Sequence, residues 1–138
     1  MNYLLDTDTV SHHQRGHAGV LQRLASVPPS DVLISTITLA EQMRGCWNAV
    51  NKARSDEELI LAHDLCRRVS EYYGRRSLVD LTKDALDRFH DLRRQGIRIG
   101  TQDLRIAAIA LQLGAILVSC NLREFRKVPG LTVEDWTT

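Results

Sequence analysis

Four residues that could bind a cation stand where short apolar segments give way to helix-like segments: Asp6, Glu41, Asp103 and Asn121. In an open parallel sheet, the carboxyl ends of the strands meet at one edge, and ligands bind there at the switch in strand order. Three carboxylates gathered at that edge without a matching lysine or arginine would repel one another by about 4 kcal/mol per close pair. A hard divalent cation would remove this repulsion, so the pattern predicts a cation site.

Each of the four residues also has a simpler explanation as part of a helix start. Thr38 and Glu41 have the spacing of a capping box, and Asn121 begins a related cap. Asp103 follows a predicted helix start, where the helix dipole alone favours an acid. Asp6 is the hardest to explain in this way, because it ends an apolar strand rather than starting a helix and needs a partner to remain ionised. Taken together at strand-to-helix crossovers, the four favour a site, with Asp6 the firmest ligand.

The residue types predict which ion this site would hold. Oxygen ligands without soft donors favour Mg²⁺, or Mn²⁺ as a substitute. The five histidines fall on predicted helices away from the strand ends, and the three cysteines are far apart without a C-x-x-C pair. A zinc site is therefore not expected.

The elements that must position these residues alternate between strands and helices along the chain. Apolar strand patterns occupy residues 3–5, 32–34, 78–81, 115–119 and 131–133. Two helical segments, one opening at Thr38 and one carrying Leu61 to Tyr72, are expected to pair as a hairpin. The alternation predicts an α/β fold: a three-layer-like sandwich with a mostly parallel central sheet and a helical hairpin, in a single domain over residues 1–138.

Composition excludes some classes of protein but names no function. The 138 residues are 43% hydrophobic and 25% charged, which is ordinary for a globular domain. The longest apolar-rich stretch, residues 106–118, is interrupted by Gln112 and Gly114 and is too short to span a bilayer. With no secretory pattern at the start, we expect a cytoplasmic protein without a membrane segment. Residues 61–138 carry thirteen Lys or Arg against ten Asp or Glu, which is weak evidence for nucleic acid.

A family resemblance rests on several motifs in fixed order: LLDTD at 4–8, TLAE at 38–41, IGTQDLRIAAIAL at 99–111, LVSCNLREF at 117–125 and VPGL at 128–131. Their order and spacing closely resemble the PIN-domain family, and within it the VapC-type toxins of bacterial toxin–antitoxin pairs. The resemblance spans nearly the whole chain. It implies a PIN-like fold and a magnesium-dependent endoribonuclease, inhibited by a cognate antitoxin that occupies or blocks the site and commonly forming a homodimer.

The resemblance also implies roles for individual residues. By position, Asp6 and Asp103 are expected to bind the metal directly, with Glu41 as the third acid. Asn121 takes the fourth polar position, which is aspartate in many relatives. Because an amide carries no charge, the number of metal ions, one or two, stays open. Asp8, which could also cap the first helix, is expected to shape the turn. The implied reaction is hydrolysis of an RNA phosphodiester by a metal-activated water.

Two other functions compete with this interpretation. Asp6-Thr7-Asp8-Thr9-Val10 fits the nucleophile motif of haloacid-dehalogenase-like phosphatases, with Asp6 as nucleophile, although no downstream lysine with a paired-acid motif follows. A non-catalytic α/β interaction domain is the other alternative. A phosphate-receiver version of it predicts a lysine at a late strand end, where this chain has Ser119-Cys120-Asn121. An aspartyl-phosphate on Asp6 would identify the phosphatase, and metal-dependent RNA cleavage would exclude the interaction domain.

Overall fold

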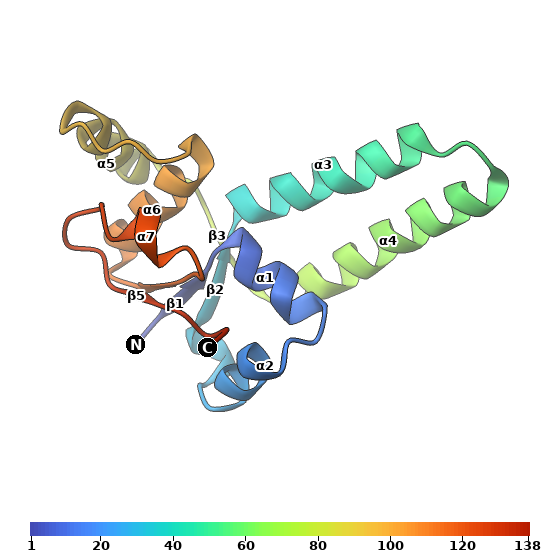
Figure 1. The fold of residues 1–138 in the computed structure, drawn as a ribbon, viewed down its shortest axis with the longest axis horizontal. Helices are drawn as coiled ribbons and strands as arrows, with labels where there is room; N and C mark the ends of the chain where they lie inside the picture. Colours follow the sequence, from blue (N-terminus) through green and yellow to red (C-terminus); the bar gives the residue numbers. More distant parts are fainter.

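The computed structural model describes residues 1–138, and its centre is a five-stranded sheet with helices on both faces (Figure 1). The strands are β1 (Tyr3–Leu5), β2 (Val32–Ser35), β3 (Ser77–Val79), β4 (Ile116–Val118) and β5 (Val133–Glu134). Their order is β3-β2-β1-β4-β5, and every neighbouring pair is parallel. The expected mostly parallel sheet is confirmed and is wholly parallel. Because the chain adds β2 and β3 on one side of β1 and β4 on the other, the order reverses between β1 and β4.

Seven α-helices connect the strands: α1 (Thr7–Gln14), α2 (Ala18–Ala25), α3 (Thr36–Lys52), α4 (Asp56–Gly74), α5 (Lys83–Arg94), α6 (Thr101–Leu113) and α7 (Leu122–Phe125). A short 3₁₀ turn, Pro29–Asp31, precedes β2. The predicted hairpin is confirmed: α3 and α4 pack side by side and extend away from the sheet (Figure 1). No helix combines the length and the apolar character needed to cross a membrane.

Local sequence explains where the main helices begin and end. The Ser55 hydroxyl accepts the N–H of Glu58 at 3.1 Å and caps α4, whose first turn carries three acids that complement the helix dipole. Gly16 and Gly114, with φ of 78° and 62°, end α1 and α6 in the left-handed region that residues with a side chain rarely adopt. These stops place the following segments against the sheet.

The core lies in two layers because successive strand residues face opposite sides of the sheet. Leu4 and Leu117 belong to the cluster under α5 and α6, whereas Leu5 and Val118 belong to the cluster under α1 and α2. All four are almost completely buried. A parallel sheet covered on both faces needs such continuous apolar strands, so the three-layer sandwich expected from the sequence is confirmed.

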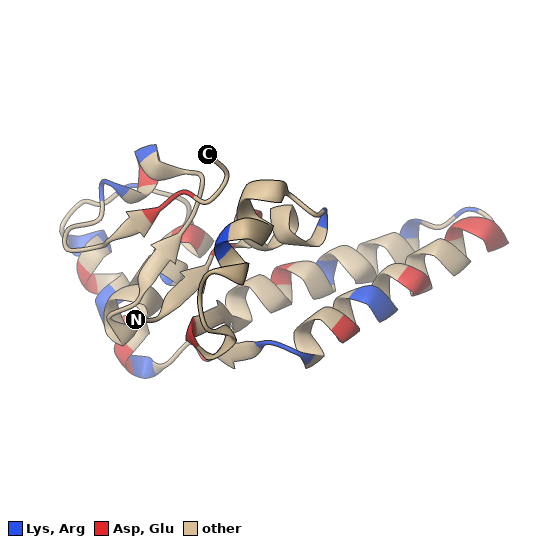
Figure 2. Cartoon of the chain, turned by 90° about the horizontal axis from the view of Figure 1, so that it is seen from below, with Lys and Arg blue, Asp and Glu red and all other residues tan.

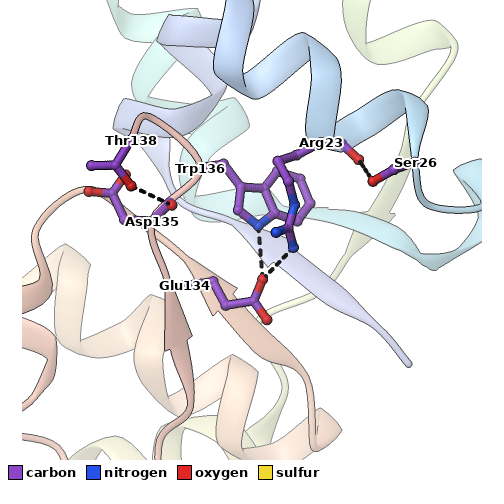
Figure 3. A network of polar contacts seen from close by, with 6 residues as sticks. All are labelled: Arg23, Ser26, Glu134, Asp135, Trp136 and Thr138. Atoms are coloured by element: carbon purple, nitrogen blue, oxygen red, sulfur yellow. Dashed lines mark hydrogen bonds and ion pairs between the residues drawn. The ribbon is translucent and has the colours of Figure 1, made fainter.

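The tail after β5 holds α2 in place (Figure 3). Trp136 is 2% exposed, and its ring centroid lies 5.3 Å from that of Tyr3. Its Nε1–H donates to Glu134 Oε1 at 3.0 Å, and Arg23 of α2 donates to the same oxygen at 2.7 Å. The Arg23 guanidinium also lies 5.2 Å from the Trp136 ring centroid. One carboxylate therefore joins α2, β5 and the tail.

Candidate active site

Asp6 follows β1 directly, at the edge of the sheet where the strand order reverses. Its N–H donates to the Val118 carbonyl at 3.0 Å, which continues the pairing of β1 with β4. Its Oδ1 accepts the Thr9 N–H at 2.8 Å, so Asp6 caps α1. The expectation that Asp6 ends a strand without starting a helix is wrong: a strand end and a helix start meet at this one residue. The expected alternative of Asp8 as the cap is wrong for the same reason.

Burial and nearby donors act in opposite directions on the Asp6 carboxyl, which is 3% exposed. Burial raises its pKa, and the charge of Asp8 adds to that effect. Hydrogen bonds from Ser119 and Thr9 lower the pKa because they stabilise the carboxylate. The expectation that Asp6 needs partners at the edge of the core is therefore met by groups of α1 and the segment after β4.

Asp103 is the point on which the negative charges of the site converge. It lies half-buried in the first turn of α6. Burial first, and then the charges of Asp6, Asp8, Glu41 and Glu124, together raise its pKa to about 6. All the charges that shift it are negative. Acids from α1, α3, α7 and the end of β1 thus act on one carboxyl. The predicted strand-to-helix crossover before Asp103 is wrong, because α6 follows α5 without a strand between them.

Glu41 reaches the site from α3, although not as a capping residue. α3 begins at Thr36, with Ser35 in the cap position, so the predicted helix start at Thr38 is wrong. Glu41 lies in the second turn, where its charge raises the pKa of Asp103 and that of the buried Tyr73 phenol. Thr38 instead shares a hydrogen bond of 3.0 Å with Thr7, which joins the starts of α1 and α3.

Asn121 comes next to the site through the short segment after β4. Its N–H donates to Ser119 Oγ at 2.9 Å, and the Ser119 hydroxyl also lowers the pKa of Asp6. The amide side chain makes no capping hydrogen bond to α7, so the predicted cap is not formed. Ser119, completely buried, therefore links the backbone of Asn121 to the carboxylate of Asp6.

Two acids that sequence reasoning left out of the site also act on Asp103: Asp8 and Glu124. Asp8 is exposed in the first turn of α1 and was assigned only to the turn. Glu124 lies on α7 and pairs with Lys127 at 3.2 Å. The available signal was position: Glu124 follows Asn121 by three residues, at the same edge of the sheet.

The donor set determines which cation would fit. The charged groups that shift the pKa of Asp103 are all carboxylates, and oxygen ligands suit a hard ion such as Mg²⁺. No three His, Cys, Asp or Glu side chains lie close enough to form a complete ligand cluster. Magnesium does not need one, since it is usually held by one or two carboxylates and keeps several waters. The Cys120 thiol is a poor ligand here, because burial and the charges of Asp6 and Asp8 raise its pKa.

Comparison with known proteins identifies the family of the chain. The family model described as PIN domain matches residues 3–131. Ribonuclease VapC1 of Haemophilus influenzae (strain R2866) is 32% identical over 140 residues, covering 99% of each chain. The tRNA(fMet)-specific endonuclease VapC of Salmonella typhimurium is 27% identical over 140 residues, covering 99% of this chain and 98% of its own.

Solved structures show the same fold over the same length. A chain of the DNA-bound VapBC structure from Salmonella typhimurium has a TM-score of 0.80 and 27% identity, covering 99% of this chain and 98% of its own. A chain of the VapBC-1 structure from nontypeable Haemophilus influenzae has a TM-score of 0.80 and 26% identity, with both chains covered completely. The matches in sequence and in fold agree, and the chain belongs to the PIN domain family, in the branch that contains the VapC proteins.

Proposed function

We propose that this chain is a metal-dependent endoribonuclease and the toxin of a toxin–antitoxin pair. The observation that carries the proposal is the set of carboxylates acting on Asp103 at the switch in strand order, with no positive charge among the groups that shift its pKa. A cluster of carboxylates suits a divalent cation. It suits a nucleophilic carboxylate or a hydrophobic ligand less well. The relatives named as ribonucleases and endonucleases supply the substrate class, RNA.

Asp6 and Asp103 would hold the ion, Mg²⁺ or Mn²⁺, with Glu41 as the third acid. When bound, such an ion supplies Lewis acidity that makes water more acidic and offsets charge on the phosphate. The chain itself supplies position: hydrogen bonds from Thr9 and Ser119 orient the Asp6 carboxyl and partly oppose the rise in its pKa that burial causes. Glu41 can accept a proton from the attacking water. Asn121 adds a neutral oxygen ligand or a hydrogen-bond donor toward the phosphate.

The phosphatase alternative is not favoured. It needs an Asp6 carboxylate oxygen that can attack phosphorus, but Asp6 is 3% exposed and its Oδ1 accepts the Thr9 N–H. The family match over residues 3–131 also gives no support for a haloacid-dehalogenase fold. The non-catalytic interaction domain has no specific observation in its favour.

We also propose that a cognate antitoxin covers the groove between α3 and α4. This groove has a volume of about 730 Å³, and eight of its ten lining residues are hydrophobic. Leu39 and Tyr73 lie at the end of the groove near the sheet, and Glu41 acts on the pKa of Tyr73. A segment seated in the groove therefore reaches the acids and can block them. The structures matched above are VapBC structures, and a further neighbour is described as a member of the VapBC family of toxin–antitoxin systems.

RNA cleavage by the Asp6→Asn variant tests the proposed activity. Asparagine keeps the capping oxygen that accepts the Thr9 N–H, so the fold should survive while the charge is lost. We expect RNA cleavage to fall about 100-fold or more, because removing even a residue that supports a metal ligand costs about 10–100-fold. Purified protein is assayed on transfer, ribosomal and messenger RNA, with Mg²⁺ and then with EDTA, which should abolish cleavage.

The matched control is Asp64→Asn on the exposed face of α4, where Asp64 pairs with Arg68. It removes the same charge far from the acids and should leave cleavage unchanged. Circular dichroism establishes that each variant is folded. Full cleavage by folded Asp6→Asn, or cleavage that persists in EDTA, would rule out the proposed site.

A further inference from the structure

A cavity lined by two arginines lies at the other end of α1 from the acids. It has a volume of about 270 Å³ and is lined by His13 of α1, Pro29, Val32, Arg75, Arg76 and Ser77, among others. Val32 and Ser77 are the first residues of β2 and β3. The cavity therefore opens at the amino ends of the strands, whereas Asp6 and Asn121 follow the carboxyl ends of β1 and β4.

The positive charge of this cavity is not balanced by a carboxylate. Arg75 and Arg76 form the link between α4 and β3, which is blue in Figure 2, and neither makes an ion pair. In contrast, two arginines earlier in α4 do form ion pairs. Arg67 lies 3.8 Å from Glu71, and Arg68 lies 3.0 Å from Asp64. The acid nearest the cavity lining in sequence, Asp31, lies 3.9 Å from the N-terminal ammonium.

Two of the side chains that line the cavity, Arg76 and His13, are held in place by Tyr72. The Arg76 guanidinium lies 4.4 Å from the centroid of the Tyr72 ring, and the Tyr72 hydroxyl lies 2.7 Å from His13 Nδ1. Burial first, and then the charge of Arg76, lower the pKa of His13, so its ring is neutral near pH 7. A guanidinium held on an aromatic face loses less freedom when it binds an anion.

We propose that this cavity binds a backbone phosphate of the RNA substrate at a subsite remote from the bond that is cut. Two arginines present the planar donors that bind phosphate in pairs, and Ser77 adds a hydroxyl. The volume lies below the range of about 300–1,000 Å³ typical of drug-sized ligands, which suits a phosphate group better than a whole nucleotide. This inference rests on the proposed function and names one of its substrate contacts.

The position of the cavity along α1, relative to the acids, fits a single RNA strand that occupies both sites. His13 follows Asp6 by seven residues, which corresponds to about 10 Å along a helix. Beyond Asp8, α1 carries no acid, and its last turn holds His12 and His13. A stacked strand advances about 3.4 Å per nucleotide, so the subsite lies about three nucleotides from the acids. A polyanion lying along α1 thus meets no further acid of that helix between Asp8 and the cavity.

Binding is tested in the non-cleaving Asp6→Asn protein, with a fluorescent single-stranded RNA of about 12 nucleotides carrying the cleaved sequence. Adding Arg75→Gln and Arg76→Gln should raise the Kd for this RNA about tenfold. The slope of log K against log salt concentration should become less steep by about 0.7, the change expected for one lost phosphate contact. In the active protein, the same pair should raise KM with kcat within twofold. The matched control, Arg67→Gln with Arg68→Gln, removes two charges from the same helix and should change neither.

A short substrate separates this subsite from a structural role. RNA with two nucleotides on each side of the cut does not reach the cavity, so its kcat/KM should be unaffected by the Arg75 and Arg76 changes. Unchanged RNA affinity in the double variant would overturn the inference, as would weakened binding of a partner protein without any loss for RNA. If the wild-type protein cleaves RNA with the same KM as the double variant, only this inference fails. If wild type cleaves no RNA, the proposed function fails with it.

Discussion

At the scale of single residues, the site is defined by charge rather than by any one side chain. Asp103 combines partial burial with four negative neighbours, and both effects favour its neutral form. Asp6 is more deeply buried, yet Thr9 and Ser119 donate to it and oppose the effect of burial. The pKa values of both proposed ligands are raised, but they differ in one respect: donors partly offset the effect of burial at Asp6, whereas no hydrogen bond lowers the pKa of Asp103.

The raised pKa of Asp103 predicts a pH-dependent stability for the metal-free protein. Its pKa is about 6 in the folded chain, against an ordinary value of 3.8. Between these values the folded state binds more protons than the unfolded state, so stability falls as pH rises from about 4 to about 6 and then stays low. Asp103→Asn removes this penalty and should stabilise the protein at pH 7.5 by on the order of 1 kcal/mol, after allowing for partial exposure.

Urea unfolding in EDTA measures this effect for wild type and Asp103→Asn at pH 4.5 and 7.5. The advantage of the variant should shrink at pH 4.5, where the folded wild-type carboxyl is already protonated. Equal advantages at the two pH values, or a variant less stable than wild type at pH 7.5, would show that Asp103 does not carry the unbalanced charge.

At the scale of elements, close packing of α2 against the tail contrasts with open space along α3. A Cβ built on Gly19 of α2 would lie 2.8 Å from the Trp136 carbonyl oxygen, a backbone atom fixed by the contacts in Figure 3. A Cβ on Gly45, in the middle of α3, would meet nothing within 4 Å. The same residue type therefore serves different purposes: Gly19 permits a contact, whereas Gly45 only weakens its helix.

Alanine at these two glycines should change stability in opposite directions. Gly45→Ala should stabilise the protein by about 0.5–1 kcal/mol, the cost of glycine relative to alanine within a helix. Gly19→Ala should destabilise it by about 1–3 kcal/mol, as in other overpacked sites, because α2 or the tail must shift. Thermal or urea unfolding of both variants provides the comparison, and effects of the same sign would disprove the close approach of α2 to Trp136.

At the scale of the whole molecule, the α3–α4 hairpin leaves a large apolar surface uncovered. Trp47 is 65% exposed, Met43 58% and Ile60 68%, and the hairpin extends beyond the sheet (Figure 1). Exposed apolar patches of this kind usually mark a surface for another protein. A homodimer, expected from the sequence, stays a prediction; the groove beside Trp47 and Met43 is assigned above to the antitoxin.

Trp47→Ala tests the assignment of this groove. The change removes the largest exposed side chain of the lining, so the complex with the cognate antitoxin should weaken at least about tenfold, as expected for a central aromatic contact. Isothermal titration with the purified antitoxin gives the affinity. Leu113→Ala, on α6 and also exposed, is the control and should bind normally. RNA cleavage by the free variant should match wild type, and undiminished antitoxin affinity would exclude the groove.

The sequence by itself determined the class of fold and the place of two residues of the candidate site. Alternating strand and helix patterns predict a parallel sheet, and residues that follow parallel strands must meet at one edge, so Asp6 and Asn121 could be placed there before any coordinates. Both inferences use short-range patterns whose geometric consequence is general.

Only the tertiary structure decided how segments distant in sequence meet. It made Asp6 a strand end and a helix cap at once, began α3 at Thr36 instead of Thr38, and brought Asp8 and Glu124 into reach of Asp103. It also left Arg75 and Arg76 unpaired beside a cavity, while neighbouring arginines found partners. Charges and caps depend on which groups come within a few ångströms, and long-range packing sets those distances.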